Sequence, residues 1–340
     1  MKKINCLFVG LGSIGQRHIR NLRKILGENI NFYAFRQTKH APLINKNGKK
    51  IKGSIEEKYN IKLINKLDKI YRENIDLVFI TNPSSLHIET VLKIKNLKNS
   101  YIFIEKPLDS NLKKIKELKY FLKNNNNKIF VGFNLKLHPG YLKLKNIINK
   151  DKILGKLNYS IFKYGENLKN FHTYENYKKS YASKTSLGGG VCLTSIHEID
   201  MMLDLFTHSK VVNYHSDNIS NLKIDAEDFS ISTHKNFFLK KRVLSIIILD
   251  FFQANTERYI KLIFEKGEIF LDLHRFYLSI TTPKNFKKYR FKNDKNLMYI
   301  EEIKIFLNLF KKNKKVPVSF SLENAIKSLE IALKIKNDYN

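Results

Sequence analysis

Short apolar runs alternate with polar segments along the first 134 residues. The runs are INCLFV at 4–9, NFYAFR at 31–36, DLVFIT at 76–81, YIFIEKP at 101–107 and KIFVGFN at 128–134. Runs of this length that end in polar clusters are typical of buried parallel strands. Their spacing leaves room for a helix between successive strands, so the pattern predicts an alternating α/β domain.

The first run leads directly into GLGSIG at 10–15, and apolar residues then recur at near-helical spacing to Leu26. Strand, glycine turn and helix form the setting in which GxGxxG indicates a dinucleotide site. We expect Gly10 to allow the tight turn, Gly12 to admit a pyrophosphate and Gly15 to let helix and strand pack closely. Ser13 and Ile14 would offer backbone N–H groups to the phosphates. A strand, turn and helix without a ligand is the simpler alternative.

Arg36 stands where a dinucleotide fold that prefers NAD usually has an acid, about 20 residues past the glycines. A guanidinium cannot accept hydrogen bonds from a ribose 2′-hydroxyl, but it pairs well with a 2′-phosphate. The sequence therefore favours NADP(H), with NAD(H) as the alternative. Lys39 is weaker support, because lysine is over-used throughout the chain.

Polar clusters follow the next three predicted strands. Ligands of open α/β sheets bind beyond the carboxyl ends of the strands, so these clusters should line one crevice above the glycine turn. The expected cofactor contacts from them are Thr81, Asn82, Pro83, His87, Glu105 and Lys106, and Asn134 is expected to contact the substrate.

The whole chain is long enough for two domains, which we place at 1–127 and 128–340. Residues 155–280 read as strand-rich. No apolar run approaches the roughly 20 residues that span a bilayer, so no membrane partner is expected. Cys6 and Cys192 are far apart and have neither a disulfide-framework nor a metal-ligand spacing, which fits a reduced cytoplasmic protein without a metal.

The formal net charge of +31 raises the question of nucleic acid. Only nine of the 62 basic residues are arginine, the residue that reads bases and phosphates best, and the lysines are spread over the whole chain. We attribute the charge to composition bias, with a modest attraction to anionic ligands, and expect no specific nucleic-acid partner.

The segment GGGVCLTSIHEID at 188–200 places three glycines before a histidine flanked by acids. Glycines lose much conformational entropy on folding, so three together indicate a backbone that passes close to something. Histidine changes protonation near neutral pH. The segment therefore has the composition of a functional site, although a hydrogen-bonded structural histidine is the plainer interpretation of His197.

Together, GLGSIG, TNPSSLH, EKP and this segment resemble the glucose–fructose oxidoreductase, inositol dehydrogenase and MocA family of NAD(P)-dependent dehydrogenases. The resemblance continues through 249–273 and the last two predicted helices. It implies an N-terminal Rossmann domain, with a doubly wound parallel sheet. A C-terminal α+β domain with a large, open, mostly antiparallel sheet should follow. It also implies pairing of these open sheets in homodimers or homotetramers.

The resemblance also implies two catalytic residues. Lys106 of EKP matches the lysine that hydrogen-bonds the reacting hydroxyl, where a cation favours alkoxide-like charge. His197 matches the proton acceptor, and a histidine with a pKa near working pH suits that task. The glycine triplet would bring the loop close to the cofactor.

One position departs from the family pattern. Many members have an aspartate four residues before the histidine, where this chain has Leu193, with Thr194 next. We expect Thr194 or Asp200 to orient His197 or to contact the substrate. The segment resembles a branch associated with cell-surface sugar biosynthesis, and in the upstream stretch 170–181 His172 or Tyr177 would reach a sugar-like substrate, unless these residues simply pack.

Three classes of function remain open from the sequence. The first is an NADP-linked dehydrogenase or reductase acting on a sugar, inositol or nucleotide-activated sugar, marked by Lys106 with His197. The second is an inert cofactor-binding sensor that contacts a protein partner. The third is a basic nucleic-acid binder, for which no recognition motif is present.

Overall fold

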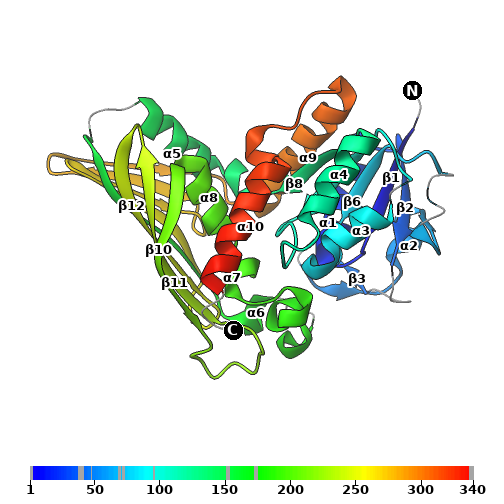
Figure 1. The fold of residues 1–340 in the computed structure, drawn as a ribbon, viewed down its shortest axis with the longest axis horizontal. Coiled ribbons are helices and arrows are strands. Elements are labelled where there is room, and N and C mark those ends of the chain that lie inside the picture. Colours follow the sequence, from blue (N-terminus) through cyan, green and yellow to red (C-terminus); the bar gives the residue numbers. More distant parts are fainter. Residues whose placement is uncertain are drawn as a thin grey trace.

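The computed structural model describes residues 3–36, 42–46, 48–67, 70, 73–94, 96–150, 154–171 and 175–336. They form two large sheets joined by helices, with the six-stranded sheet near the N-terminus and the eight-stranded sheet at the other end of the molecule, and a small two-stranded sheet (Figure 1). No helix in these ranges is long and apolar enough to cross a membrane.

The first sheet is entirely parallel, in the order β5-β2-β1-β6-β7-β8. This is the doubly wound Rossmann order, with the chain reversing direction across the sheet between β1 and β6. Its strands are β1 (Ile4–Val9), β2 (Ile30–Phe35), β5 (Ile61–Leu63), β6 (Leu77–Ile80), β7 (Tyr101–Glu105) and β8 (Lys128–Gly132). Between them lie α1 (Ser13–Leu26), the hairpin β3 (Leu43–Ile44) and β4 (Lys50–Ile51), α2 (Ile55–Tyr59), η2 (Ser84–Leu86), α3 (His87–Lys93) and α4 (Ile115–Asn125).

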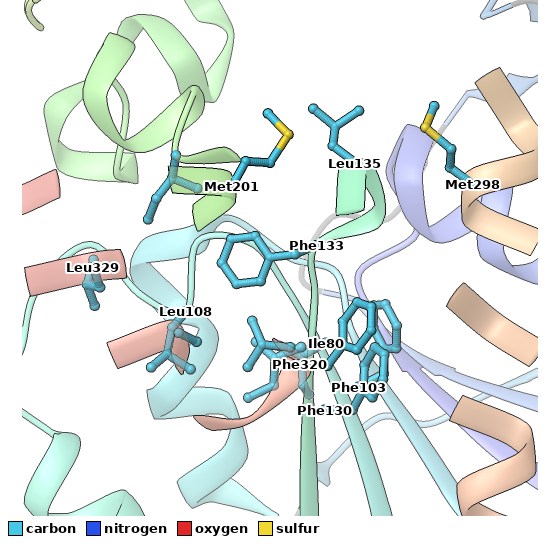
Figure 2. Close-up of a cluster of buried hydrophobic side chains, with 14 of the residues drawn as sticks. Ile80, Phe103, Leu108, Phe130, Phe133, Leu135, Met201, Met298, Phe320 and Leu329 are labelled. Carbon is cyan, nitrogen blue, oxygen red and sulfur yellow. The ribbon is translucent and has the colours of Figure 1, made fainter. Parts of the chain in front are cut away.

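A row of phenylalanines crosses this sheet. Phe8, Phe79, Phe103 and Phe130 are register partners on β1, β6, β7 and β8, and each ring stacks on the next at centroid distances of 4.9, 4.9 and 5.3 Å. Phe320, from near the C-terminus, stacks on Phe130 at 4.6 Å and extends the row (Figure 2). Offset aromatic stacking of this kind adds to the burial of the rings themselves.

The second sheet has the order β10-β11-β12-β9-β13-β14-β15-β16 and is antiparallel except where β9 meets β12. The predicted fold class is therefore confirmed. The strands are β9 (Leu157–Gly165), β10 (Thr207–Asp217), β11 (Phe229–Phe238), β12 (Lys241–Asp250), β13 (Glu257–Phe264), β14 (Gly267–Asp272), β15 (Tyr277–Thr282) and β16 (Asn285–Arg290).

Helices fill the space between the two sheets, and α10 (Leu322–Lys336) runs through the middle of it (Figure 1). The others on this side are η3 (Asn134–Leu137), α5 (Pro139–Lys150), α6 (Leu168–Phe171), η4 (Tyr177–Lys179), η5 (Tyr181–Ser183), η6 (Thr185–Leu187), α7 (Val191–Thr194), α8 (His197–Leu205) and η7 (Val318–Phe320). Figure 2 shows Phe133 and Leu135, just after β8, with Met201 of α8 on one side and Met298 on the other. These residues are buried and form an apolar layer between the sheets.

A long helix that precedes α10 returns to the first sheet. Helix α9 (Lys295–Lys312) packs against α1, and its Phe306 lies edge-on to Phe79 and Phe103. Strand β8 belongs to the same sheet, so the division predicted after residue 127 would cut through it. We propose a division after β8, with α9 crossing back to cover the first sheet.

Candidate active site

Four neighbouring parallel strands end at one edge of the first sheet. They lead into Gly10 after β1, Thr81 after β6, Lys106 after β7 and, two residues past β8, Asn134. Because parallel strands end at the same edge, the sequence-predicted clusters lie together there, at the edge where ligands bind in such folds.

The glycine turn has the tight geometry expected of it. Gly10 has φ +98°, and a Cβ there would lie 2.7 Å from the backbone nitrogen of Asn82. A Cβ on Gly15 would lie 2.6 Å from the carbonyl oxygen of Gly10. A Cβ on Gly12 would meet no atom within 4 Å, so the space in front of this residue is open. Two of the three glycines thus close the turn, and the third faces an empty approach.

The N-terminus of α1 lies open at this approach. Gly12 is the N-cap, no side chain caps the helix, and its first turn has no acidic residue. The free backbone N–H groups, including those of Ser13 and Ile14, and the helix dipole favour an anion. These features fit the diphosphate of a dinucleotide.

Thr81 and His87 brace the loops of this edge from inside. The Thr81 hydroxyl donates to the Gly10 carbonyl at 2.7 Å. The ring nitrogens of His87 lie 2.8 Å from the carbonyl oxygen of Pro107 and 2.9 Å from that of Asn82. Both side chains are buried. The predicted cofactor contact of His87 is therefore replaced by a role in joining two loops, while Asn82 and Pro83 remain at the edge.

Arg36 lies directly after β2, and the Gly10 N–H donates to the carbonyl of the preceding Phe35. The backbone of Arg36 therefore follows a strand end that is hydrogen-bonded to the glycine turn. The guanidinium forms an ion pair with Glu56 in the first turn of α2, and each side chain is only 14% exposed. No local signal in the sequence indicates this acid. Lys39 falls outside the described residues.

Glu105 of EKP faces α1. Its Oε1 lies 2.6 Å from Nε2 of His18, which is fully buried and packs against the rings of both Phe79 and Phe103. The predicted role of Glu105 in binding the cofactor is therefore replaced by an internal pair that fixes the start of the loop holding Lys106.

Lys106 reaches across from the first sheet to the helices of the second. Its Nζ donates to the carbonyl oxygen of Thr194 at 2.7 Å. Burial lowers the pKa of Lys106 to about 8, against the raising effect of Glu105. The ammonium is thus held close to the residue three positions before His197.

His197 begins α8 and lines a cavity together with Asn134. Burial, followed by the positive charges of Lys106 and Arg258, lowers the pKa of His197 well below its ordinary value. The imidazole is therefore neutral at neutral pH. The expected pKa near working pH is corrected accordingly: a desolvated ring among cations binds a proton poorly.

Asp200 does not orient His197, contrary to expectation. Its carboxylate is buried and is bound by Lys136 Nζ at 2.8 Å and by the Asn324 side-chain amide at 2.7 Å. In the described part of the chain no side chain hydrogen-bonds the ring of His197. Thr194 Oγ1 is buried and has no hydrogen-bond partner there either. Thr194 does not line the cavity, so its predicted contact with the substrate stays a prediction.

Glu198 points away from His197. It binds Nε of Arg258 at 2.8 Å, and that guanidinium lies 3.8 Å above the ring of Tyr164. Tyr164 in turn donates to Glu166.

The cavity also has residues that sequence reasoning missed. Among these residues, Arg17 and Arg258 could have been noticed in the sequence, because arginine is scarce in this chain. The additional residues that line the cavity are Arg17, Leu135, Tyr164, Glu166, Thr256, Arg258, Leu273, His274, Phe276, Lys295, Met298 and Tyr299.

The two upstream candidates gain no support. His172 falls outside the described residues. Tyr177 is half-buried, packs against the hydrophobic core and does not line the cavity. It acts there as a packing residue.

The glycine triplet packs closely against other parts of the protein. Added Cβ atoms would meet Ser84 Oγ at Gly188, three carbonyl oxygens of residues 181–184 at Gly189, and the carboxylate of Glu227 at Gly190. Glu227 also pairs with Lys336, whose Nζ donates to the Gly189 carbonyl at 2.6 Å. The triplet therefore joins the first sheet's loops, the segment 181–187 and the last helix.

Comparison with known proteins agrees with this geometry. A family model described as "Oxidoreductase family, NAD-binding Rossmann fold" matches residues 4–133. An uncharacterized oxidoreductase, YrbE, of Bacillus subtilis is 26% identical over 154 residues, which cover 45% of this chain and 42% of that protein. Myo-inositol 2-dehydrogenase of Thermotoga maritima is 28% identical over 145 residues, 43% of this chain and 40% of that protein. The match thus spans less than half the length of these relatives.

A solved structure resembles the whole chain. UDP-N-acetylglucosamine 3-dehydrogenase GnnA of Acidithiobacillus ferrooxidans superimposes with a TM-score of 0.74, at 16% identity, over 100% of this chain and 98% of that one. At that identity the likeness shows the fold alone, which includes the second sheet. Residues 4–133, with their glycine turn, are therefore similar to the oxidoreductase family with an NAD-binding Rossmann fold, the family named for glucose–fructose oxidoreductase, inositol dehydrogenase and MocA, and the rest of the chain shares the fold of the solved structure.

Proposed function

We propose that this protein is an NAD(P)-dependent oxidoreductase that transfers a hydride between the nicotinamide and a hydroxyl or keto carbon. The substrate is a sugar, an inositol or a nucleotide-activated sugar. The observation that supports this most is the meeting of Lys106 and His197. The lysine is hydrogen-bonded to Thr194. Burial lowers the pKa of the histidine three residues later, and the charge of this lysine lowers it further.

In the oxidation direction, His197 accepts the hydroxyl proton as the C=O bond forms. Its ring is neutral at neutral pH, so it is in the state that can accept a proton. The Lys106 ammonium stabilises the negative charge that develops on the oxygen. When bound, the nicotinamide supplies the hydride acceptor, and in reduction the same residues act in the opposite sense.

We propose that NADP(H) is favoured and that NAD(H) is the alternative. Arg36 beside the glycine turn supports the first. The ion pair of Arg36 with Glu56 opposes a preference for NADP(H), because a carboxylate repels a 2′-phosphate and can accept hydrogen bonds from ribose hydroxyls. Glu56, whose position beside Arg36 is not evident from the sequence, thus weakens the argument for a preference for NADP(H).

We propose a homodimer or homotetramer formed through the outer face of the second sheet. Supporting this, apolar side chains on neighbouring strands are exposed there as register partners: Leu244 is 42% exposed and Tyr159 38%. Such an apolar face is usually covered by a partner.

The test of the activity is direct. The purified protein is first denatured and its extract examined by mass spectrometry for bound nucleotide and sugar. It is then incubated with NADP⁺ or NAD⁺ and with myo-inositol, glucose, glucuronate or UDP-N-acetylglucosamine, and reduced nicotinamide is followed by absorbance. Turnover that is lost in Lys106→Ala supports the proposal. Cofactor binding without turnover on any of these or on the co-purified sugar favours the inert sensor.

A further inference from the structure

The cavity that holds His197 is built largely from charged and aromatic side chains of separate elements. Arg17 comes from the first turns of α1, Lys295 from the first residue of α9, and Arg258 from β13. The acidic residue that lines it is Glu166. The two sheets and α9 therefore bring three permanent cations and one carboxylate to the same cavity.

Two of these charges are already matched within the protein. Arg258 binds the carboxylate of Glu198 and stacks on Tyr164. Glu166 accepts a hydrogen bond from the Tyr164 hydroxyl. Arg258 is thus neutralised locally, and Glu166 is held on one wall.

The other two cations lack such a match. Arg17 lies with its guanidinium 4.6 Å from the centre of the Tyr299 ring, and in the described ranges it has no carboxylate within ion-pair distance. The same holds for Lys295. Burial lowers the pKa of the neighbouring His274, and the charge of Lys295 lowers it further. Cations gathered in a cavity gain most from an anion that displaces water between them.

The cavity is therefore basic at a place where composition bias alone does not account for it. Arginine is rare in this chain, and Arg17 and Arg258 represent two of its nine arginines. Lys295 is an exposed lysine, the form that the general excess of positive charge takes, whereas the guanidinium of Arg17, between the Tyr299 ring and the cavity, has a fixed geometry.

Building on the proposed oxidoreductase function, we propose that the substrate carries an anionic group, a carboxylate or a phosphate, which Arg17 and Lys295 bind. The sugar ring then lies across the aromatic wall of Tyr164, Phe276 and Tyr299, and the reacting hydroxyl faces His197 and Lys106. Neutral inositols and simple sugars lack the group that this cavity is built to hold.

Binding is measured by isothermal titration calorimetry at about 0.15 M salt, where nonspecific attraction to a basic surface is screened. The protein is saturated with NADP⁺ and titrated with UDP, glucuronate, glucose or myo-inositol. We expect UDP or glucuronate to bind at least about tenfold more tightly than the neutral compounds, which is about 1.4 kcal/mol. If only UDP binds tightly, the anionic group of the substrate is a phosphate. If only glucuronate binds tightly, it is a carboxylate.

Arg17→Gln and Lys295→Gln should each weaken that binding by about tenfold. Matched controls are Arg242→Gln and Lys241→Gln, which remove the same charges at the exposed start of β12. The other end of that strand is the one near the cavity, where Asp250 pairs with Gly165, the residue before Glu166. They should change the affinity by less than about twofold.

Three results would overturn the inference: neutral compounds that bind as tightly as both anions, controls that lose as much affinity as the cavity variants, or Arg17→Gln that weakens NADP⁺ binding as much as anion binding. The proposed hydride transfer is judged separately. A protein that oxidises a neutral polyol refutes only the anionic substrate, and one that binds UDP or glucuronate without turning over any sugar refutes only the oxidoreductase.

Discussion

Lys106 Nζ donates to the main-chain carbonyl of Thr194 at 2.7 Å, so a residue at the edge of the first sheet is fixed to the turn that leads into His197. The lysine therefore arrives in a defined position, which electrostatic stabilisation of a reacting oxygen requires. Lys106→Ala should lower turnover by roughly 100-fold or more while the affinity for NADP(H), followed by cofactor fluorescence, changes by less than about threefold. Lys113→Ala, at an exposed position of the following loop, is the control; turnover within about threefold of the unaltered protein in Lys106→Ala would make EKP structural.

The same lysine predicts an alkaline limit to activity. Its pKa is lowered to about 8 by burial, so the ammonium is present below that pH and is lost as the pH rises through it. Turnover should fall above about pH 8 as the charge disappears. Lys106→Arg keeps a charge at all these pH values and should remove the fall, even at a lower rate. A fall that persists unchanged in this variant would assign it to another group.

His197→Asn should abolish proton transfer and keep the shape of the site, with turnover reduced by roughly 100-fold or more. Because the pKa of His197 lies well below its ordinary value, the rate of the unaltered protein should stay level from pH 7 down through pH 6 rather than fall near the usual histidine value. A pH–rate profile measures this. A loss of half the rate near pH 6.5 would show that the ring is more accessible to water than the structure indicates.

Cofactor choice should depend on Glu56 as well as on Arg36. Glu56→Gln removes the carboxylate paired with the guanidinium and should tighten the binding of NADP(H) relative to that of NAD(H). Arg36→Asp should reverse or erase any preference for NADP(H). Glu57→Gln, the exposed neighbour on α2, removes the same charge and should leave the ratio unchanged. Fluorescence titration at fixed salt gives the two dissociation constants. If the ratio of the two dissociation constants is the same in Glu56→Gln as in the unaltered protein, this carboxylate has no part in binding the adenosine ribose.

Substitution of alanine for Gly190 and for Gly12 should have different effects on stability and on cofactor binding. Gly190 has φ +98°, and a Cβ there would lie 2.2 Å from the Glu227 carboxylate, so Gly190→Ala should lower the free energy of unfolding by about 1–3 kcal/mol or more. Gly12→Ala meets no atom within 4 Å, so it should leave that free energy nearly unchanged but weaken cofactor binding. Urea denaturation and cofactor titration separate the two effects. Equal stability of both variants would contradict the packing described for the triplet.

Acid should destabilise the fold through its buried histidines. Burial lowers the pKa of His138 to about 4 and that of His234 to about 4. The unfolded chain therefore binds protons below about pH 6.5 that the folded chain does not, and stability is lost as the pH falls through this range. His138→Asn retains an acceptor for the Gly140 N–H and should reduce the loss between pH 7 and 5 by about 2 kcal/mol. The pH dependence of urea unfolding tests this; an identical dependence in the variant would refute it.

The first sheet was the part most accessible from sequence, because its apolar runs, its glycine spacing and the polar residues after each strand are all local signals. Lys106 and His197 belong to such signals, and they lie where the strand ends predict. The partners of these residues are not local: Glu56 pairs with Arg36, Lys136 with Asp200 and Glu227 with Lys336. Each pair joins segments that only the folded chain brings together.

The cavity shows the same limit. Asn134 was found because it follows a strand, whereas Arg17 and Lys295 lie 278 residues apart in the sequence and meet only because α9 packs on α1. The interpretation of Asp200 failed for a related reason. Its spacing from His197 is correct for contact on a helix, but a buried lysine from η3 offers the carboxylate a stronger partner.

The stacked phenylalanines have a consequence for biosynthesis of the chain. Residues 4–132 emerge from the ribosome with one face of their sheet lined by Phe79, Phe103 and Phe130, and the side chains that cover this face, Phe306 and Phe320, are translated last. The first sheet of the nascent chain therefore keeps an exposed apolar face until synthesis is nearly complete. Premature termination before α9 would release a polypeptide that chaperones and proteases recognise, rather than a free-standing nucleotide binder.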